Sequence, residues 1–253
     1  MSRPAPLVKL TRTNTLVIFS DDHLGAVDHD AKHFDECIRW CLDNEATVYL
    51  SGDHVENSSL TGKDAGEKML EQAMWPTAQV KAFIEAMRPL ARKGRICGAL
   101  RGNHESRSRR EALLDVCELI AHALDVRYDG VGGMLRFQAG MEVYPVAIHH
   151  GRSGAGNTFL ELDRMCRLYP TAELVSLGHN HDLTARRIQH VDVGPDGAER
   201  IRVRWQVRSG TMLRFADYAR NLCLAPSLVG HPVIRFSPKS HDIAVDVTTL
   251  SWT

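Results

Sequence analysis

Residues 15–23 read TLVIFSDDH, a short apolar run followed at once by polar side chains. The run is rich in β-branched residues and has the length of a strand. Asp21 and His23 follow it two positions apart, and in an extended chain residues i and i+2 face the same way. The stretch therefore predicts a strand that presents a carboxylate and an imidazole to one point at its carboxyl end.

Four more apolar runs of strand length occur along the chain, and each is followed by a polar cluster. The runs span residues 46–50, 95–100, 142–148 and 174–177, and the clusters are SGDH (51–54), RGNHE (101–105), HHG (149–151) and GHNH (178–181). Ligands of open α/β sheets bind outside the carboxyl ends of the strands, so the five clusters are expected to meet at one rim. Their glycines would let the backbone turn sharply beside a crowded centre.

Helical patterns separate these strands. Amphipathic spacing predicts helices over residues 33–43 and 110–124. The segment from 65 to 92 predicts two helices, of which the second begins at Pro76 and ends near Pro89 and Gly94.

The pattern changes after Asp182. Residues 190–193 and 201–207 flank the turn sequence GPDG, and residues 233–236 and 243–247 flank SPKSHD, which predicts two antiparallel hairpins. Strands that alternate with helices, followed by hairpins, indicate an α/β protein with antiparallel members in its sheets. The chain contains no repeat and no long linker, so we expect a single domain over residues 1–253.

Composition narrows the class of protein. The 253 residues are 43% hydrophobic and 25% charged, which is typical of a soluble globular chain, and 31 Lys and Arg balance 31 Asp and Glu. This balance gives no overall field toward nucleic acid or an anionic membrane. The six cysteines form no C-x-x-C pair and are expected to be reduced core thiols. Neither a signal peptide nor a membrane span is recognisable, which predicts a cytoplasmic protein with no membrane partner.

The chemistry of the polar clusters predicts a metal site. They supply Asp, Asn and His without thiolate, the ligand set of hydrolytic sites for Mn, Fe, Zn, Ni or Co rather than of a structural zinc. Six or seven ligands exceed the needs of one tetrahedral ion, so we expect two divalent transition-metal ions and one bridging carboxylate. A pair of ions ~3.5–4 Å apart can clamp the attacking and leaving oxygens of a displacement at phosphorus.

At these residues the sequence resembles the calcineurin-like metallophosphoesterases. The pattern of that family is D-x-H, G-D, G-N-H-[DE], a histidine after a strand and G-H-x-H, and all five motifs occur here in this order between residues 15 and 182. The stretch HHGRSGAGNTF is similar to a run in a bacterial and phage branch. The resemblance implies two mixed β-sheets packed as a sandwich and flanked by helices, with C-terminal antiparallel hairpins.

The resemblance also implies roles for single residues. The metal ligands would be Asp21, His23, Asp53, Asn103, His179, His181 and one histidine of the 149–150 pair, with Asp53 bridging the two ions. Manganese is the expected metal, with Fe, Zn, Ni and Co as alternatives. A bridging hydroxide would attack a phosphodiester or phosphomonoester, and His104 would protonate the leaving oxygen as the general acid.

Several assignments stay open at this point. Adjacent side chains of an extended segment point to opposite faces, so only one of His149 and His150 can be a ligand. The histidine directly before Gly151 matches the bacterial and phage run, which favours His150. Arg107 and Arg152 are candidate substrate contacts.

Other residues of the clusters receive no chemical role. Glu105 is interpreted as a carboxylate that starts a helix or supports a ligand, and Glu56 as a residue at the border of the pocket. Asp22 and His54 are expected to face away from the site or to line its rim. Five histidines without ligand spacing are expected to be solvated: His29, His33, His190, His231 and His241.

Two other functions are considered. A nuclease acting on DNA or RNA would use the same site, although the balanced charge gives little support for binding a phosphate backbone. A non-catalytic scaffold of the same fold would be expected to lose ligands, whereas this chain keeps each ligand type. Oligomeric state is left open.

Overall fold

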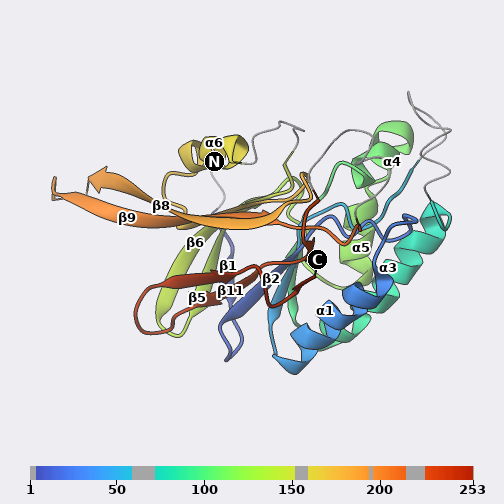
Figure 1. The fold of residues 1–253 in the computed structure, drawn as a ribbon, viewed down its shortest axis with the longest axis horizontal. Helices are drawn as coiled ribbons and strands as arrows, with labels where there is room; N and C mark the ends of the chain where they lie inside the picture. Colours follow the sequence, from blue (N-terminus) through green and yellow to red (C-terminus); the bar gives the residue numbers. More distant parts are fainter. Residues whose placement is uncertain (1–3, 59–71, 152–158, 194–195, 215–225, 253) are drawn as a thin grey trace.

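Two β-sheets pack face to face, with helices on their outer sides (Figure 1). The computed structural model describes residues 4–58, 72–151, 159–193, 196–214 and 226–252. The five-stranded sheet has the order β12 (Ile243–Asp246), β11 (Val233–Phe236), β2 (Thr15–Phe19), β3 (Thr47–Leu50), β4 (Ile96–Ala99). In it β2, β3 and β4 are parallel, and β11 is antiparallel to both β2 and β12.

The six-stranded sheet is also mixed. Its order is β1 (Leu7–Lys9), β5 (Gly133–Ala139), β6 (Glu142–His149), β7 (Leu174–Leu177), β9 (Glu199–Ser209), β8 (Leu183–Val193). A short pair, β10 (Val229–Gly230) and β13 (Ser251–Trp252), lies apart from both sheets. The prediction of two mixed sheets with C-terminal antiparallel hairpins is therefore confirmed.

The alternation of side chains along β2 explains why the sheets and helices form layers. Leu16 and Ile18 belong to a buried cluster shared with the six-stranded sheet, whereas Val17 and Phe19 belong to a cluster shared with the helices. Since successive strand residues point to opposite faces, a strand buried on both faces must be apolar throughout. This is the physical reason for the unbroken TLVIF run.

Helices cover the outer face of each sheet. The five-stranded sheet is covered by α1 (Ala31–Asp43), α3 (Pro76–Arg92) and α5 (Val116–Ala123), and the six-stranded sheet by α6 (Leu160–Leu168) (Figure 1). Helices α1 and α3 and the two hairpins lie where the sequence predicts them, with Pro89 inside α3. The helix predicted ahead of Pro76 falls largely on residues 59–71, outside the described residues. None of the described helices combines the length and apolar character needed to cross a membrane.

The single helix predicted over residues 110–124 is wrong, because two helices occupy this region. Helix α4 (Glu105–Ala112) ends at Leu113, which has a left-handed φ of 57°, and α5 begins three residues later. The Asp115 carboxylate accepts a backbone N–H of the first turn of α5 at 3.2 Å and an Arg101 N–H at 2.6 Å. A helix-capping aspartate held in this way fixes the start of a new helix.

The packing between the sheets predicts where a substitution lowers the free energy of unfolding most. Phe137 is fully buried there and stacks on Phe236 with a centroid distance of 5.7 Å. Phe137→Ala should lower the free energy of unfolding by about 3–5 kcal/mol, because it removes a large side chain and leaves a cavity. Urea unfolding measures this. Met141→Ala, at a position 93% exposed in the turn after β5, is the control, and an equal effect of both variants would contradict the assignment of the core.

Candidate metal centre

The polar clusters that follow β2, β3, β4, β6 and β7 meet at one edge of the sandwich. The first three strands belong to one sheet and the last two to the other, so the site lies where the carboxyl ends of the two sheets meet. Among the described residues three groups of donor atoms result, and in each the ligand atoms lie within 4.8 Å of one another: Asp21/His23/His181, Asp53/His150/His179 and His23/Glu56/His104. The convergence predicted from five distant stretches is present, but across two sheets rather than along one.

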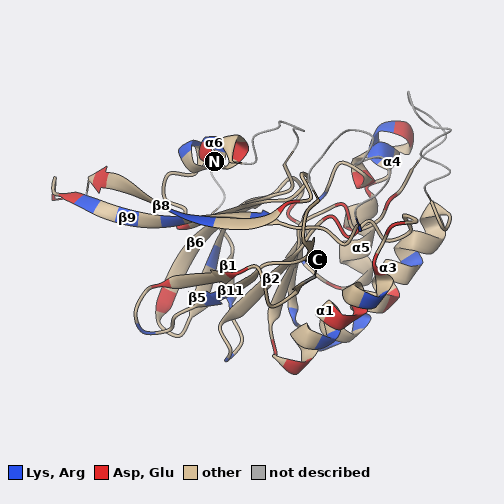
Figure 2. Ribbon diagram, in the orientation of Figure 1, with Lys and Arg blue, Asp and Glu red and all other residues tan. Residues whose placement is uncertain are grey.

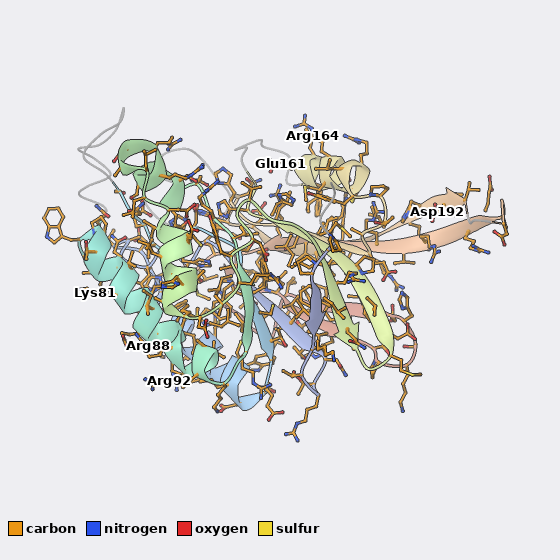
Figure 3. All side chains as sticks on the ribbon, turned by 180° about the vertical axis from the view of Figure 1, so that it is seen from behind. Lys81, Arg88, Arg92, Glu161, Arg164 and Asp192 are labelled. Atoms are coloured by element: carbon orange, nitrogen blue, oxygen red, sulfur yellow. The ribbon has the colours of Figure 1, made fainter. Side chains whose placement is uncertain are left out.

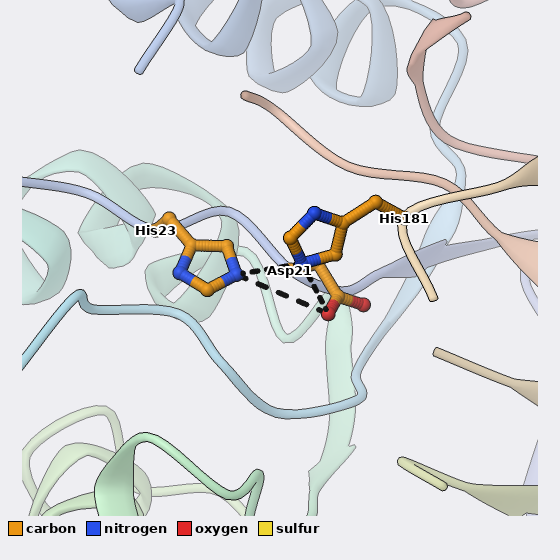
Figure 4. A group of neighbouring side chains, drawn as sticks. All are labelled: Asp21, His23 and His181. Atoms are coloured by element: carbon orange, nitrogen blue, oxygen red, sulfur yellow. Dashed lines mark hydrogen bonds and ion pairs between the residues drawn. The ribbon is translucent and has the colours of Figure 1, made fainter. Parts of the chain in front are cut away.

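The first group consists of Asp21, His23 and His181 (Figure 4). The Nε2 atoms of His23 and His181 face each other at 3.1 Å, and the Asp21 Oδ1 atom lies 3.5 Å from His181 Nε2 and 4.0 Å from His23 Nε2. Asp21 is fully buried, and its carboxylate accepts the backbone N–H of His179 and the Ser20 hydroxyl. Three donor atoms thus point at one small volume from two distant loops.

The second group consists of Asp53, His150 and His179. The Nε2 atom of His150 lies 3.0 Å from Asp53 Oδ2 and 3.0 Å from Asn103 Oδ1. Burial by itself raises the pKa of Asp53, but the nearby His150 and His104 outweigh it and hold that pKa well below its usual range. The buried Asp53 side chain is therefore a carboxylate at neutral pH.

The first and second groups fit a divalent transition-metal ion. Two ligands at ~2.0–2.1 Å from a tetrahedral ion lie about 3.3 Å apart, close to the nitrogen–nitrogen distance between His23 and His181. Carboxylate, amide oxygen and imidazole nitrogen are the donors that such ions accept.

The backbone of the candidate ligands differs from the extended form expected from their spacing. Left-handed φ values occur at Asp21 (53°), His23 (48°), Asp53 (52°), His179 (71°) and His181 (59°). Non-glycine residues rarely adopt this region, at a cost of about 1–3 kcal/mol each, and such residues gather at functional sites. These five donors are therefore aimed by strained turns rather than by the regular alternation of a strand.

The Glu105 side chain supports the second group from behind. It is fully buried, and its carboxylate accepts the backbone N–H groups of Asp53 (3.0 Å), His54 (2.7 Å) and Gly102 (3.1 Å). These bonds tie the loop after β3 to the loop after β4. The interpretation of Glu105 as a supporting carboxylate agrees with these contacts.

The His104 side chain belongs to the third group, with His23 and Glu56. Its Nε2 atom is 3.9 Å from Asp53 Oδ2, and its Nδ1 atom lies 2.8 Å from the Glu56 carbonyl oxygen and 3.4 Å from Glu56 Oε1. Glu56 also accepts from His23 Nδ1 at 2.9 Å and from Arg107 at 3.3 Å. No motif in the sequence marks Glu56, because its contacts come from His23 after β2 and from His104 and Arg107 at the start of α4.

Glu56 also determines the charge of its neighbours. Burial by itself raises the pKa of Glu56, but His104 and His23 outweigh it and hold that pKa well below its usual range. In turn, burial lowers the pKa of His23, while Glu56, Asp53 and Asp21 raise it to about 9. Negatively charged carboxylates thus lie close to the protonated ring of His23.

A second buried polar network backs the first group. The Asp22 carboxylate lies 2.6 Å from His54 Nδ1 and 3.0 Å from His231 Nε2, and all three side chains are fully buried. Burial raises the pKa of Asp22, but hydrogen bonds from His231 and His54 lower it to about 2. The expectation that His231 is solvated is wrong, as it is for His33, which is buried against the Leu250 carbonyl.

Comparison with known proteins bears on the fold. No protein-family model matches the sequence, and neither does any curated protein. A putative 5′-nucleotidase from Staphylococcus aureus has a similar structure, at 12% identity and a TM-score of 0.50, over 92% of this chain and 52% of that one. The present chain thus spans about half the length of that protein.

The chain has the calcineurin-like metallophosphoesterase fold. A predicted phosphoesterase from Streptococcus pneumoniae is also similar, at 12% identity and a TM-score of 0.41, over 92% of this chain and 88% of that one. A metallophosphoesterase from Sphaerobacter thermophilus shares 16% identity over 91% and 87% of the two chains, at a TM-score of 0.40.

Within the metallophosphoesterase fold, the two histidines at the end of β6 point in different directions. His150 is buried in the second donor group, and its Nδ1 atom lies 2.9 Å from the Ser51 carbonyl oxygen. His149 lies outside both groups, with Nε2 2.8 Å from the Tyr169 hydroxyl. This placement supports His150 as the ligand. Arg152, by contrast, lies outside the described residues.

Metal stoichiometry tests the choice between these histidines. His150→Ala should bind one manganese ion fewer per chain than the unmodified protein, because it removes a donor from the Asp53 group. His149→Phe should retain the full complement, since its ring contacts Tyr169 rather than the donor atoms. Elemental analysis after equilibration with manganese measures both. Loss of metal only in His149→Phe would reverse the assignment.

The close approach of the loops after β3 and β4 gives a second prediction. A Cβ atom at Gly102 would overlap the Asp53 carboxylate and the Asp53 backbone nitrogen. Gly102→Ala should therefore weaken manganese binding by about 10–100-fold, comparable to the loss of a supporting contact, as measured by calorimetric titration. Gly94→Asn is the control, because a Cβ atom at Gly94 meets nothing within 4 Å and asparagine tolerates its left-handed φ. Equal affinities in the two variants would contradict this prediction.

Proposed function

We propose that this chain is a hydrolase of phosphate esters that requires two divalent transition-metal ions, with manganese as the expected metal. The main observation that supports this proposal is a pair of donor groups, Asp21/His23/His181 and Asp53/His150/His179, with His104 beside Asp53. Asn103 would complete the second set, and Asp53 would bridge. When bound, the two ions would supply Lewis acidity and an activated water for attack at phosphorus.

The side chains around His104 suit it to proton transfer. Its Nδ1 atom is held by Glu56, which fixes the ring and leaves Nε2 toward Asp53 and the donor groups. We propose that Nε2 delivers a proton to the leaving oxygen of the ester as a general acid. Glu56 acts as a positioning residue in this scheme.

Arg107 would contact the substrate. Its guanidinium donates to His104 Nε2 at 2.9 Å and to the Glu56 carbonyl at 2.9 Å. Since Nε2 must carry a proton to act as an acid, Arg107 must release it when substrate binds. A phosphoryl oxygen is a favourable alternative acceptor, because guanidinium forms strong charge-assisted bonds to phosphate.

The non-catalytic scaffold is the less favoured alternative. A scaffold has no need of buried carboxylates and imidazoles whose donor atoms converge, since leaving them there strains the backbone at five positions. The described residues retain donor groups together with the neighbouring His104, which a purely structural role leaves unexplained.

Two substitutions separate metal binding from catalysis. His104→Ala should keep both manganese ions and lose about 10²–10⁴-fold in the rate of bis(p-nitrophenyl) phosphate hydrolysis, because only the proton donor is removed. Asp53→Asn should lose both the metal and the activity. Absorbance of released p-nitrophenol and elemental analysis give the two readouts.

The matched control is His122→Ala, at an exposed position of α5 away from the donor groups. It should keep the rate and the metal content of the unmodified protein. A His104→Ala rate equal to that of His122→Ala would count against the proposed acid, and an unmodified protein that binds no manganese would end the proposal.

A further inference from the structure

A cavity of about 550 Å³ opens beside the candidate metal centre, between α4 and α6. Asn103 and His150, two of the candidate ligands, are among the residues that line it. Ser106 and Arg110 of α4 line one part of the cavity, and Arg164 of α6 lines another. Ligand pockets in proteins have volumes of ~300–1,000 Å³, so the space is large enough for a substantial organic group.

The cavity and the candidate acid lie on different sides of α4. Ser106 and Arg110, four positions apart, line the cavity, as neighbours on one helix face do. Arg107 and Ser108 instead contact the segment that carries Glu56 and Asn57. His104 is held by that same segment and is not among the residues that line the cavity.

This separation has a consequence for the ester. In a displacement at phosphorus, the leaving oxygen must lie at the proton donor, which is His104 in the proposed function. A group that occupies the cavity beside Asn103 and His150 therefore cannot be the leaving group. It must be attached to phosphorus through an oxygen that is retained. A phosphomonoester has no such group, whereas a phosphodiester has one.

We infer that the substrate is a phosphodiester whose retained ester group occupies this cavity; the inference rests on the proposed function and narrows its substrate class. The scissile P–O bond breaks on the His104 side, water supplies the new P–O bond, and the proton from His104 goes to the released alcohol. The product that remains beside Asn103 and His150 is the phosphomonoester of the retained group.

The cavity wall determines the kind of retained group. Val131, Met165, Leu168 and Leu177 provide apolar surface, and the ring of His149 lies among them. His149 Nε2 lies 2.8 Å from the Tyr169 hydroxyl, and this contact holds the flat imidazole ring in the cavity wall. A bulky group with a flat apolar part, of aryl or nucleoside size, matches this surface.

Charge at the cavity favours an anionic ester. Arg110 and Arg164 line it from α4 and α6, and both helices carry basic residues (Figure 2). Glu161 and Arg164 both extend from α6 (Figure 3), and Glu161 is paired with Arg208 at 3.2 Å. The arginines would attract the single negative charge of a phosphodiester without forming a dedicated dianion site.

A series of diesters with one common leaving group tests the inference. Methyl, phenyl and naphthyl p-nitrophenyl phosphates share p-nitrophenol and differ only in the retained group. The unmodified protein with manganese should show kcat/KM at least about tenfold higher for phenyl than for methyl, because burying a ring adds apolar contact. Its kcat/KM should also be higher for the phenyl and naphthyl diesters than for the monoester p-nitrophenyl phosphate.

A cavity-filling variant locates the effect. Leu168→Trp places a large ring at an exposed position of the cavity wall, and the ratio of phenyl to methyl kcat/KM should fall toward one. Leu119→Trp, at an exposed position of α5 that does not line the cavity, should keep the unmodified ratio. Calorimetric titration with phenyl phosphate and methyl phosphate gives a readout independent of turnover, and phenyl phosphate should bind more tightly only where the cavity is open.

The outcomes are distinguishable. Hydrolysis of none of these esters would overturn the proposed function and this inference together. Hydrolysis of the methyl diester with a phenyl-to-methyl ratio near one, a preference for the monoester, or an unchanged ratio in Leu168→Trp would overturn the inference while the proposed function stands.

Discussion

The structure of the candidate centre depends on one buried carboxylate, that of Glu105. It accepts the backbone N–H groups of Asp53, His54 and Gly102, and so joins the loops that follow β3 and β4. The Asp53 carboxylate in turn accepts a hydrogen bond from the His104 backbone N–H at 2.7 Å. This reciprocal pairing places the Asp53 carboxylate and the candidate proton donor His104 side by side. It also satisfies backbone groups that would otherwise be buried at a cost of about 1–3 kcal/mol each.

The same requirement explains the polar layers behind the site. The donor residues in left-handed turns have buried carbonyl groups and buried polar neighbours, and both need hydrogen-bond partners. Residues of the C-terminal third of the chain provide such partners. Thr211 donates its hydroxyl to the Asp21 carbonyl at 2.8 Å, and His231 meets Asp22. Thr211 and His231 therefore support the candidate metal centre, although neither contributes a donor atom to the groups found among the described residues.

Sequence reasoning succeeds here where one local rule decides the outcome. The run at residues 15–19 predicts β2 at its observed bounds, because an apolar β-branched stretch has few alternatives. Sequence reasoning fails where the conformation or burial of a residue depends on a contact with a distant segment. The break at Leu113 depends on Asp115 binding Arg101, and the burial of His231 depends on Asp22. Likewise, the left-handed turns at Asp21 and His181 are imposed by the site itself, so no spacing rule reveals them.

Helix α4 contacts both the segment that holds His104, the proposed acid, and the cavity. This double contact would limit how substrate selectivity can change. One face of α4 meets the Glu56 segment that orients His104, and another lines the cavity through Ser106 and Arg110. Because α4 spans eight residues and begins next to His104, any rotation that reshapes the cavity also moves Arg107 relative to the Glu56 segment. Selectivity for the retained group can therefore change through α6 and Val131 more readily than through α4.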